Sequence, residues 1–150
     1  MKVILQKVKK ASVSVDGKIV GEIDKGYCLL VGVHKESTEA DAKYLAKKIV
    51  EARLFEDENE KLNLGLKDVN GSILSVSQFT LYADTKKGKR PSFTNAASAE
   101  EANELYNKFN EYLREEGIKV ETGIFQTMME VNIINDGPVT IIYEKLSSGN

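Results

Sequence analysis

Hydrophobic positions in the first third of the chain recur with the period of two that is typical of β-strands. The alternation runs through residues 3–8 and again through residues 11–15. Asp16-Gly17, a dipeptide typical of two-residue hairpin turns, separates the second run from residues 18–23. Residues 26–33 form a continuous apolar run, which predicts a strand buried on both faces. This part of the chain is therefore expected to form a β-sheet.

Two later segments carry apolar residues at the three- and four-residue spacing of amphipathic helices. The first segment spans residues 42–53 and follows a cap signal at Thr38. The second begins at Ser98, where Glu101 would complete a capping box, and Gly117 ends it. The pattern predicts two main helices.

Further strands are expected around these helices. One lies between them at 72–79, and three follow the second helix near 118–125, 128–134 and 139–146. No internal repeat, linker or low-complexity segment interrupts the pattern. Residues 1–150 are therefore expected to form a single α+β domain with many strands and two main helices.

The composition is that of an ordinary globular protein, with 41% hydrophobic and 29% charged residues. No apolar run approaches the ~20 residues of a membrane span, so no membrane partner is expected. The net charge of −2 argues against a generic basic nucleic-acid binder and leaves room for a local basic site.

Cysteine and histidine each occur once, as Cys28 and His34. This excludes a disulfide framework, a cysteine-based zinc site and a multi-histidine metal centre, so no metal site is predicted. A reducing, cytoplasmic location fits this cysteine usage best. Cys28 lies in the apolar run and is interpreted as a core residue. His34 is interpreted as a solvated loop residue rather than a catalytic one.

One of the two prolines, Pro138, follows Gly137 between the strongly β-forming runs 131–134 and 139–143. Proline cannot donate to a sheet ladder, so it should lie at a strand start or in a tight connection. A cis peptide also costs little at an X-Pro bond. From these residues alone, an ordinary turn and a rigid arrangement of backbone carbonyls both remain open.

A second motif, Ser77-Gln78-Phe79-Thr80-Leu81, stands at the end of a β run. Taken alone it is weak, because Ser and Thr at strand ends usually bond the local backbone. Together with Asn135-Asp136-Gly137-Pro138-Val139-Thr140, it resembles the two signature motifs of the D-aminoacyl-tRNA deacylases. The resemblance runs along the whole chain and includes Ala11-Ser12-Val13, Gly21-Glu22-Ile23, Leu62-Asn63-Leu64 and Arg90-Pro91-Ser92-Phe93.

This resemblance implies a homodimeric α+β fold with a barrel-like sheet core and two main helices. In that family the Gly-Pro pair, here Gly137-Pro138, is cis and enters the partner subunit's active site. Its carbonyls face the α-amino group and Cα of the aminoacyl group, so a D-amino acid is accepted and an L side chain would clash. Glycine should also pass, since it has no side chain to reject.

The implied reaction is hydrolysis of the ester between the amino acid and the 3′-terminal adenosine of tRNA, with no cofactor. This removes D-amino acids from mischarged tRNA and so protects homochirality in translation. The residues that match the family's catalytic strand are Ser77, Gln78, Phe79 and Thr80. The residues implied in substrate binding or in the chiral gate are Lys7, Phe125, Met129, Asn135, Gly137 and Pro138. For Phe125, ordinary core packing is an equal alternative.

Two mechanisms compete for this reaction. Thr80 could act as a nucleophile, but no nearby general base is evident from the sequence. Alternatively, the ribose 2′-OH of the terminal adenosine could help activate water while backbone N–H groups around Gln78 and Phe79 stabilise the oxyanion. The missing base favours the second mechanism.

Lys7 stands where the family commonly carries an arginine that braces the Gly-Pro loop. Lysine offers a point charge without the guanidinium fork, which leaves the tightness of the loop and its strictness against L-substrates open.

A basic cluster consists of Lys86, Lys87, Lys89 and Arg90. It would suit the phosphates of a tRNA acceptor stem, although solvated surface lysines are an equal alternative. Two other functions remain open: an editing-type module acting with a synthetase, and a structural or nucleic-acid-binding protein without activity. No DNA partner is expected.

Overall fold

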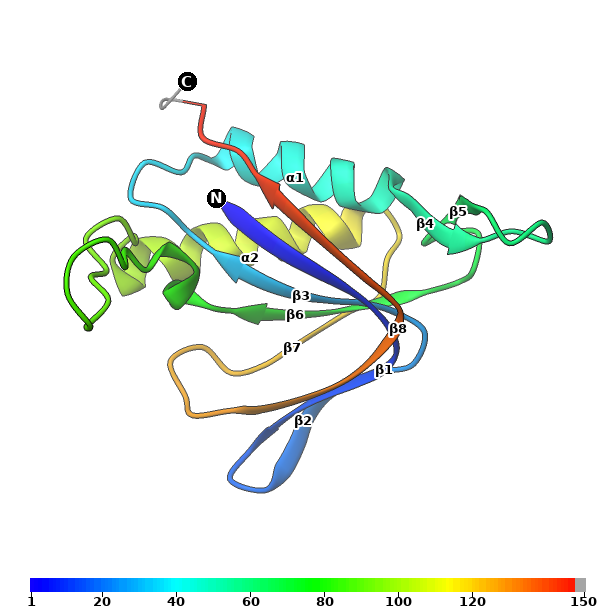
Figure 1. The fold of residues 1–150 in the computed structure, drawn as a ribbon, viewed down its shortest axis with the longest axis horizontal. Coiled ribbons are helices and arrows are strands. Elements are labelled where there is room, and N and C mark those ends of the chain that lie inside the picture. Colours follow the sequence, from blue (N-terminus) through cyan, green and yellow to red (C-terminus); the bar gives the residue numbers. More distant parts are fainter. Residues whose placement is uncertain (148–150) are drawn as a thin grey trace.

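The computed structural model describes residues 1–147, in which two helices cover one face of a strongly curved β-sheet (Figure 1). In chain order the elements are β1 (Lys2–Val15), β2 (Lys18–Ile23), β3 (Gly26–Gly32), α1 (Glu39–Glu51), β4 (Arg53–Glu56), β5 (Leu62–Gly65), β6 (Ser72–Ser77), the 3₁₀ helix η1 (Phe79–Tyr82), α2 (Ala99–Glu115), β7 (Val120–Thr122) and β8 (Glu130–Glu144).

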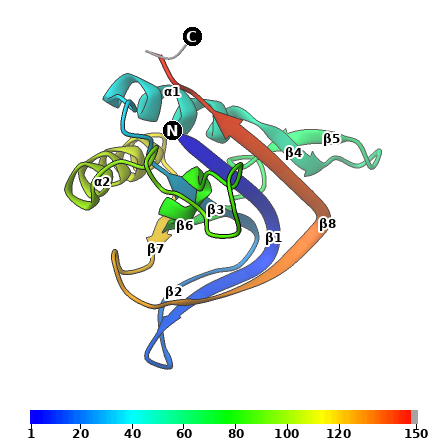
Figure 2. The same ribbon diagram turned by 60° about the vertical axis from the view of Figure 1, so that its left-hand side comes forward.

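Strand β1 is the centre of the sheet. Along one of its edges it pairs antiparallel first with β3 and then with β2, and along the other edge it pairs with β8. On the far side of β3 follow β6 and β7, both in parallel pairing. The sheet is strongly curved, and β7 and β8 are the outermost strands at its two ends (Figure 2). This is the barrel-like α+β core that the sequence predicts.

Two hydrophobic clusters fill the two faces of this sheet. The larger lies between the sheet and the helices, and includes Tyr27, Leu29 and Phe109. The smaller lies inside the curve of the sheet and includes Cys28 and Leu74. Because β3 contributes to both clusters, its residues are apolar without alternation. The buried strand that the sequence predicts here is confirmed.

The hairpin and the helix starts are also as predicted. Asp16 and Gly17 have φ angles of 50° and 78°, as a two-residue hairpin turn between β1 and β2 requires. Thr38 caps α1, and both bonds of its capping box are present. At α2 the Ser98 side chain accepts a hydrogen bond from the Glu101 N–H at 3.3 Å.

Several boundaries differ from the prediction. Residues 3–8 and 11–15 belong to one continuous strand, β1, and the segments 128–134 and 139–146 merge into β8. The expected strand at 118–125 is only the short β7. The hairpin of β4 and β5 was not predicted, because each strand has four residues and shows no clear alternation.

Cys28 is fully buried, and burial raises the pKa of its thiol to about 12. The thiolate is the reactive form of cysteine. The interpretation of Cys28 as a core residue is therefore confirmed.

Candidate functional site

The motif at the end of β6 borders a cavity of about 510 Å³. The cavity lies between the ends of β3 and β6, the start of α2 and the loop from β7 to β8. Most of the lining is apolar, with a few polar side chains near the motif. The lining residues are Val31, Val33, Val76, Ser77, Gln78, Phe79, Ala97, Ala99, Ala102, Phe125, Gln126, Thr127, Met128, Met129 and Val131.

Residues 78–82, which we call the site turn, leave the strand direction at once after Ser77. The predicted strand therefore ends two residues early, and η1 follows it. The Gln78 N–H donates to Val31 O at 2.8 Å, which anchors the turn to β3. The Leu81 N–H in turn donates to Gln78 O at 3.3 Å. The turn is thus fixed to the sheet by backbone bonds.

Gly32, at the end of β3, makes room for this turn. A Cβ atom on Gly32 would lie 2.9 Å from Leu81 Cβ and 3.2 Å from Gln78 O. Both atoms belong to the inner part of the turn, so neither can move without shifting the turn itself. A glycine is required here because of close approach rather than because of an unusual backbone angle.

The four residues predicted as catalytic lie together. Ser77, Gln78 and Phe79 line the cavity, and the exposed Thr80 is joined to them because its hydroxyl accepts a hydrogen bond from Gln78 Nε2. The Gln78 N–H is already bonded to Val31, so it is not available to stabilise an oxyanion. Phe79 is the first residue of η1, and the first N–H groups of a helix have no acceptor within that helix. The Phe79 N–H is therefore not used by η1.

His34 is the one imidazole that could serve as a base, and it does not line this cavity. It lies in the loop after β3, where its Nδ1 accepts a hydrogen bond from the Glu36 N–H at 3.0 Å. Its ring packs edge-on against Tyr82 at 5.0 Å. The loop position predicted for His34 is confirmed. Within residues 1–147 no group of three or more potential metal ligands occurs, and no helix is long and apolar enough to span a membrane.

Phe125 and Met129 both lie where the sequence predicts, in the lining of the cavity. Phe125 is half-buried and also packs against the Tyr106 ring at 6.4 Å, so it serves both the core and the cavity. Met129 occupies the space that a Cβ atom on Gly123 would need. The Tyr106 hydroxyl donates to Ser75 O at 2.7 Å, and burial raises the pKa of Tyr106, so this bond to β6 is kept over a wide pH range.

The Gly137-Pro138 bond is cis, as predicted. Gln6 pairs with Thr140 and Val8 pairs with Asn135, so residues 136–139 loop out of the ladder opposite a single β1 residue. None of residues 135–140 lines the cavity of the same chain. The bend of β8 lies at the right of the molecule, whereas the loops near the cavity lie at the left (Figure 1).

Lys7 is the β1 residue opposite that looped-out segment, and its side chain is buried. Its ammonium group donates to Leu54 O at 3.0 Å and lies 5.4 Å from the centre of the Phe55 ring. The side chain therefore holds the start of β4. It does not make the hydrogen bond to the Gly-Pro loop that the resemblance led us to expect of an arginine at this position.

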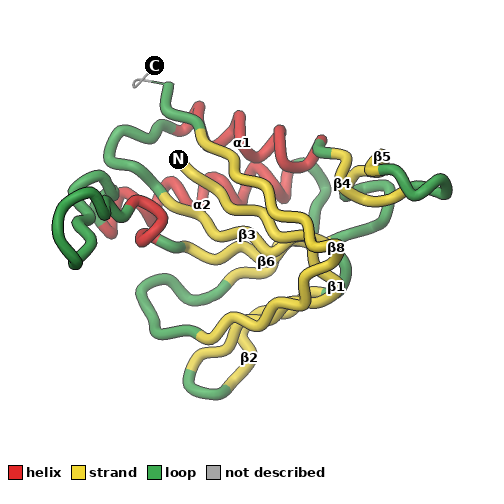
Figure 3. Tube along the Cα trace, in the orientation of Figure 1, coloured by secondary structure: helices red, strands yellow, loops and turns green. Residues whose placement is uncertain are grey.

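The four residues of the predicted basic cluster are exposed in the long loop between η1 and α2 (Figure 3). Residues 84–92, which we call the basic loop, are closed at their base by two hydrogen bonds between Asp84 and Ser92, of 2.7 and 2.9 Å. The ion pairs found within residues 1–147 involve none of Lys86, Lys87, Lys89 and Arg90. Their charges are available to an anionic partner.

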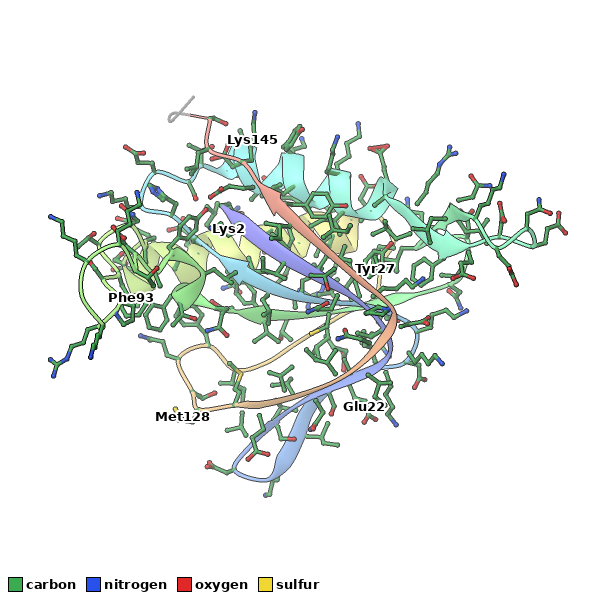
Figure 4. The ribbon with its side chains drawn as sticks, viewed as in Figure 1. Lys2, Glu22, Tyr27, Phe93, Met128 and Lys145 are labelled. Atoms are coloured by element: carbon green, nitrogen blue, oxygen red, sulfur yellow. The ribbon has the colours of Figure 1, made fainter. Side chains whose placement is uncertain are left out.

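Sequence reasoning missed several residues of the site. Gln126 lines the cavity with a φ angle of 60°, which is uncommon for a residue other than glycine. Met128 is 92% exposed at the tip of the loop between β7 and β8 (Figure 4). Neither has a sequence signal. Three alanines in or just before the first turn of α2 also line the cavity: Ala97, Ala99 and Ala102. Small residues gathered near a helix start are a sequence signal for such a site.

A family model and the most similar relatives point to one family. A family model described as D-Tyr-tRNA(Tyr) deacylase matches residues 4–144. A D-aminoacyl-tRNA deacylase of Staphylococcus haemolyticus is 62% identical over 96% of this chain and 95% of its own length. A protein of the same name from Exiguobacterium sibiricum is 58% identical over 97% of this chain and 100% of its own length.

Two solved structures have the same fold. One, titled c-Myc DNA Unwinding Element Binding Protein, has a TM-score of 0.90 and 40% identity, and the alignment covers 97% of this chain and 99% of that chain. The other, titled as a probable eukaryotic D-amino acid tRNA deacylase, has a TM-score of 0.82 and 16% identity. Its alignment covers 95% of this chain and 97% of that chain, and at this identity it supports the fold alone.

Proposed function

The chain belongs to the D-Tyr-tRNA(Tyr) deacylase family, and we propose that it hydrolyses the ester between a D-amino acid and the 3′-terminal adenosine of tRNA. The observation that carries this proposal is the 62% identity over nearly the whole chain to a D-aminoacyl-tRNA deacylase. The product pair is free D-amino acid and reusable tRNA. Glycine is included as a substrate, and the reaction needs no cofactor.

The cavity beside the site turn is the proposed binding site for the aminoacyl-adenosine end of the tRNA. Its exposed aromatic wall, Phe79, offers a surface on which a base can stack. Phe125 and Met129 supply further apolar contacts. An unpaired terminal nucleotide is a suitable ligand for such a cavity, because its base and ribose are not held in a duplex.

The chiral gate is proposed to be Gly137-Pro138 with Asn135, acting in the cavity of a partner subunit. Support comes from the position of the loop, which is exposed, leaves the β1–β8 ladder and lies outside the cavity of its own chain. Backbone carbonyls in that cavity would accept hydrogen bonds from the α-amino group. They would leave no room for an L side chain, so discrimination would act by exclusion.

A homodimer is the assembly that this gate requires. The outward side of β8 supports it, because Ile134 and Ile142 are 55% and 66% exposed there. The outer edge of β8 also pairs with no other strand among residues 1–147. Exposed apolar side chains on an unpaired edge are typical of a surface that another chain covers.

For the chemical step we propose water attack assisted by the ribose 2′-OH, with the Phe79 N–H near the developing oxyanion. The hydroxyl of Thr80 accepts a hydrogen bond from the Gln78 amide, and no base is bonded to it within residues 1–147. A hydrogen bond from this amide reduces the electron density on Thr80 Oγ1 and so makes the oxygen a weaker nucleophile. Ser77 and Gln78 are left to position the ester, which is already activated.

We propose the basic loop as the contact with the acceptor-stem phosphates, tRNA as the partner and the cytoplasm, where tRNA is used, as the location. A role on DNA or at a membrane is not part of this proposal. The net charge of −2 gives no general attraction to nucleic acid, so tRNA affinity should depend on the four local cations.

One assay tests the function. Purified protein is incubated with D-tyrosyl-tRNA, L-tyrosyl-tRNA and glycyl-tRNA, and release of the amino acid is followed. We expect hydrolysis of the D- and glycyl forms only. Hydrolysis of none would overturn the enzymatic function and favour a binding protein, and equal hydrolysis of the D- and L-forms would overturn the gate. Activity that appears only after addition of a synthetase would favour the editing module.

A further inference from the structure

We propose that Phe93 is a positioning residue that couples phosphate binding by the basic loop to the site turn. The proposal rests on the proposed function, and it assigns a role to a residue outside both signature motifs. Phe93 lies next to the base of the basic loop in sequence and next to Phe79 in space. It therefore connects the proposed tRNA contact to the cavity.

The basic loop is narrow and stiff at its base. The two hydrogen bonds between Asp84 and Ser92 close it, and Asp84 Oδ1 also accepts from the Lys86 N–H at 2.9 Å. Residue 92 is thus held in place at the base of the loop, so phosphate binding by the loop acts directly beside the next residue. The next residue in the chain is Phe93.

The Phe93 ring contacts the site turn directly. It packs edge-to-face on Phe79, with ring centres 5.0 Å apart and an angle of 60° between the planes. Both rings remain accessible, with 36% of Phe93 and 56% of Phe79 exposed. They therefore form a surface pair beside the cavity rather than part of the core, and the position of each ring depends on the other.

On its other side Phe93 is tied to the body of the protein. The Ala96 N–H donates to Phe93 O at 3.1 Å, and the Ala97 N–H donates to Val33 O at 2.9 Å. Phe93 consequently connects the basic loop to the segment that leads into α2. Figure 4 shows it in the projecting loop at the left, on the same side of the molecule as Met128.

The positive charge of the basic loop explains why phosphate binding would affect Phe79 through Phe93. The basic loop carries four cations that take part in none of the ion pairs found within residues 1–147, and a substrate with a phosphate backbone can bind to them. Binding energy from a remote part of a substrate raises kcat when it is used to order the reacting centre. Ordering of Phe79 through Phe93 would use the binding energy of the phosphates in this way. The kcat should therefore be higher for whole tRNA than for its isolated 3′ end.

The test compares D-tyrosyl-tRNA with D-tyrosyl-adenosine, which lacks the phosphates. For Phe93→Ala we expect kcat on the tRNA to fall about tenfold, the size of one aromatic pair, with KM changed by less than about threefold. Turnover of D-tyrosyl-adenosine should fall clearly less, because this substrate has no phosphates for the basic loop to bind. Phe93→Tyr keeps the ring and should restore kcat. Thermal unfolding of each variant verifies that it is folded.

A second readout uses Lys87→Glu/Lys89→Glu. If Phe93 transmits the effect of phosphate binding, Phe93→Ala should have little further effect on kcat in this background. Equal loss on both substrates, a rise in KM alone, or full additivity with the charge variant would each overturn the role of Phe93. If the wild-type protein hydrolyses neither substrate, the proposed function itself fails, and this result is distinct from the other three.

Discussion

Gln78 Nε2 donates a hydrogen bond to Thr80 Oγ1, and within residues 1–147 no hydrogen bond joins this hydroxyl to a group that could act as a base. From this we predict that Thr80→Ala retains D-aminoacyl-tRNA hydrolysis. The loss of one hydrogen bond should lower kcat no more than about tenfold. Single-turnover kinetics with D-tyrosyl-tRNA measures the effect, with Thr80→Ser as the variant that keeps the hydroxyl. Complete loss of turnover with substrate binding intact would contradict the 2′-OH-assisted mechanism.

Gly32→Ala is predicted to displace the site turn. The new Cβ would lie 2.9 Å from Leu81 Cβ, and displacement of catalytic groups by about 1 Å costs on the order of 100-fold in rate. We expect a fall in kcat of that order with a smaller change in KM. Gly65→Ala in β5 is the matched control, since its Cβ would meet no atom closer than 3.4 Å. Similar activity of the two variants would show that the close approach at Gly32 is unimportant.

Charge reversal in the basic loop should weaken tRNA binding and flatten its salt dependence. For Lys87→Glu/Lys89→Glu, the slope of log affinity against log salt should decrease by about two, one for each phosphate that the loop no longer neutralises. Filter binding at several salt concentrations gives the slope. Lys47→Glu/Lys61→Glu changes the net charge equally at two other exposed lysines. If both double variants behave alike, the basic loop has no specific role in binding tRNA.

Asp41 links the start of α1 to the C-terminal end of the described chain. Burial opposes ionisation of this carboxyl group, but hydrogen bonds from Ser147 and from the Thr38 N–H outweigh burial and hold its pKa below the usual 3.8. A carboxyl group with a lowered pKa stabilises the fold above about pH 4, and this contribution is lost as the pH falls through the lowered value. Asp41→Asn should therefore reduce the free energy of unfolding by about 1–2 kcal/mol at pH 7.

The difference between wild type and Asp41→Asn should shrink as the pH falls below about 4. Urea unfolding at pH 7, 5 and 3.5 measures it. Asp24→Asn makes the same change in charge at an exposed position and should have little effect at any of these pH values. A difference for Asp41→Asn that is constant with pH would mean that ionisation of Asp41 does not contribute.

Gly137→Ala is predicted to reduce chiral discrimination. Gly137 has a φ angle of 118°, and a Cβ there would lie 2.9 Å from Val139 Cγ2 and 3.2 Å from Val139 N. The loop must therefore shift, and the ratio of D- to L-tyrosyl-tRNA hydrolysis should fall by at least about tenfold. Gly17→Ala is the control, because Gly17 also has a positive φ angle but lies in an open hairpin turn.

Mixed dimers test whether the gate acts across subunits. A dimer of one Gly137→Ala chain and one Phe79→Ala chain contains one cavity in which an intact gate meets an intact Phe79, provided the gate comes from the partner. Such a dimer should combine Phe79-dependent turnover with discrimination against the L-form, a combination that neither homodimer has. No recovery in mixed dimers isolated by two affinity tags would mean that the gate acts within its own chain.

The sequence predicted the sheet and helices well because short-range chemistry determines them. The Asp16-Gly17 turn and the Thr38 cap each follow from local residue types, and both are found. The four residues at the end of β6 were found by motif; the structure places Ser77, Gln78 and Phe79 at one cavity and bonds Thr80 to Gln78. The continuous length of β1 was missed because exposed Lys9 and Lys10 interrupt its alternation, although β8 and β2 still pair around them.

The remaining parts of the site depend on tertiary contacts that no local pattern encodes. The contact between Phe93 and Phe79 joins residues fourteen positions apart, and nothing in the sequence distinguishes Phe93 from a core phenylalanine. The left-handed backbone of Gln126 is likewise imposed by its neighbours, since glutamine has no preference for it. The side chain of Lys7 is directed to Leu54 by the position of β4, a strand that the sequence did not predict.

The pairing of β1 with β8 has a consequence for synthesis on the ribosome. The first strand of the chain finds its outer partner only when residues 130–144 have been made, so the sheet stays incomplete until nearly the whole chain has emerged. Until then β1 exposes an unpaired edge that can associate with other chains. The looped-out Gly137-Pro138 segment is carried by this last strand. Val131 of the same strand lines the cavity, so the cavity and the looped-out segment are both completed by the stretch of chain that is made last.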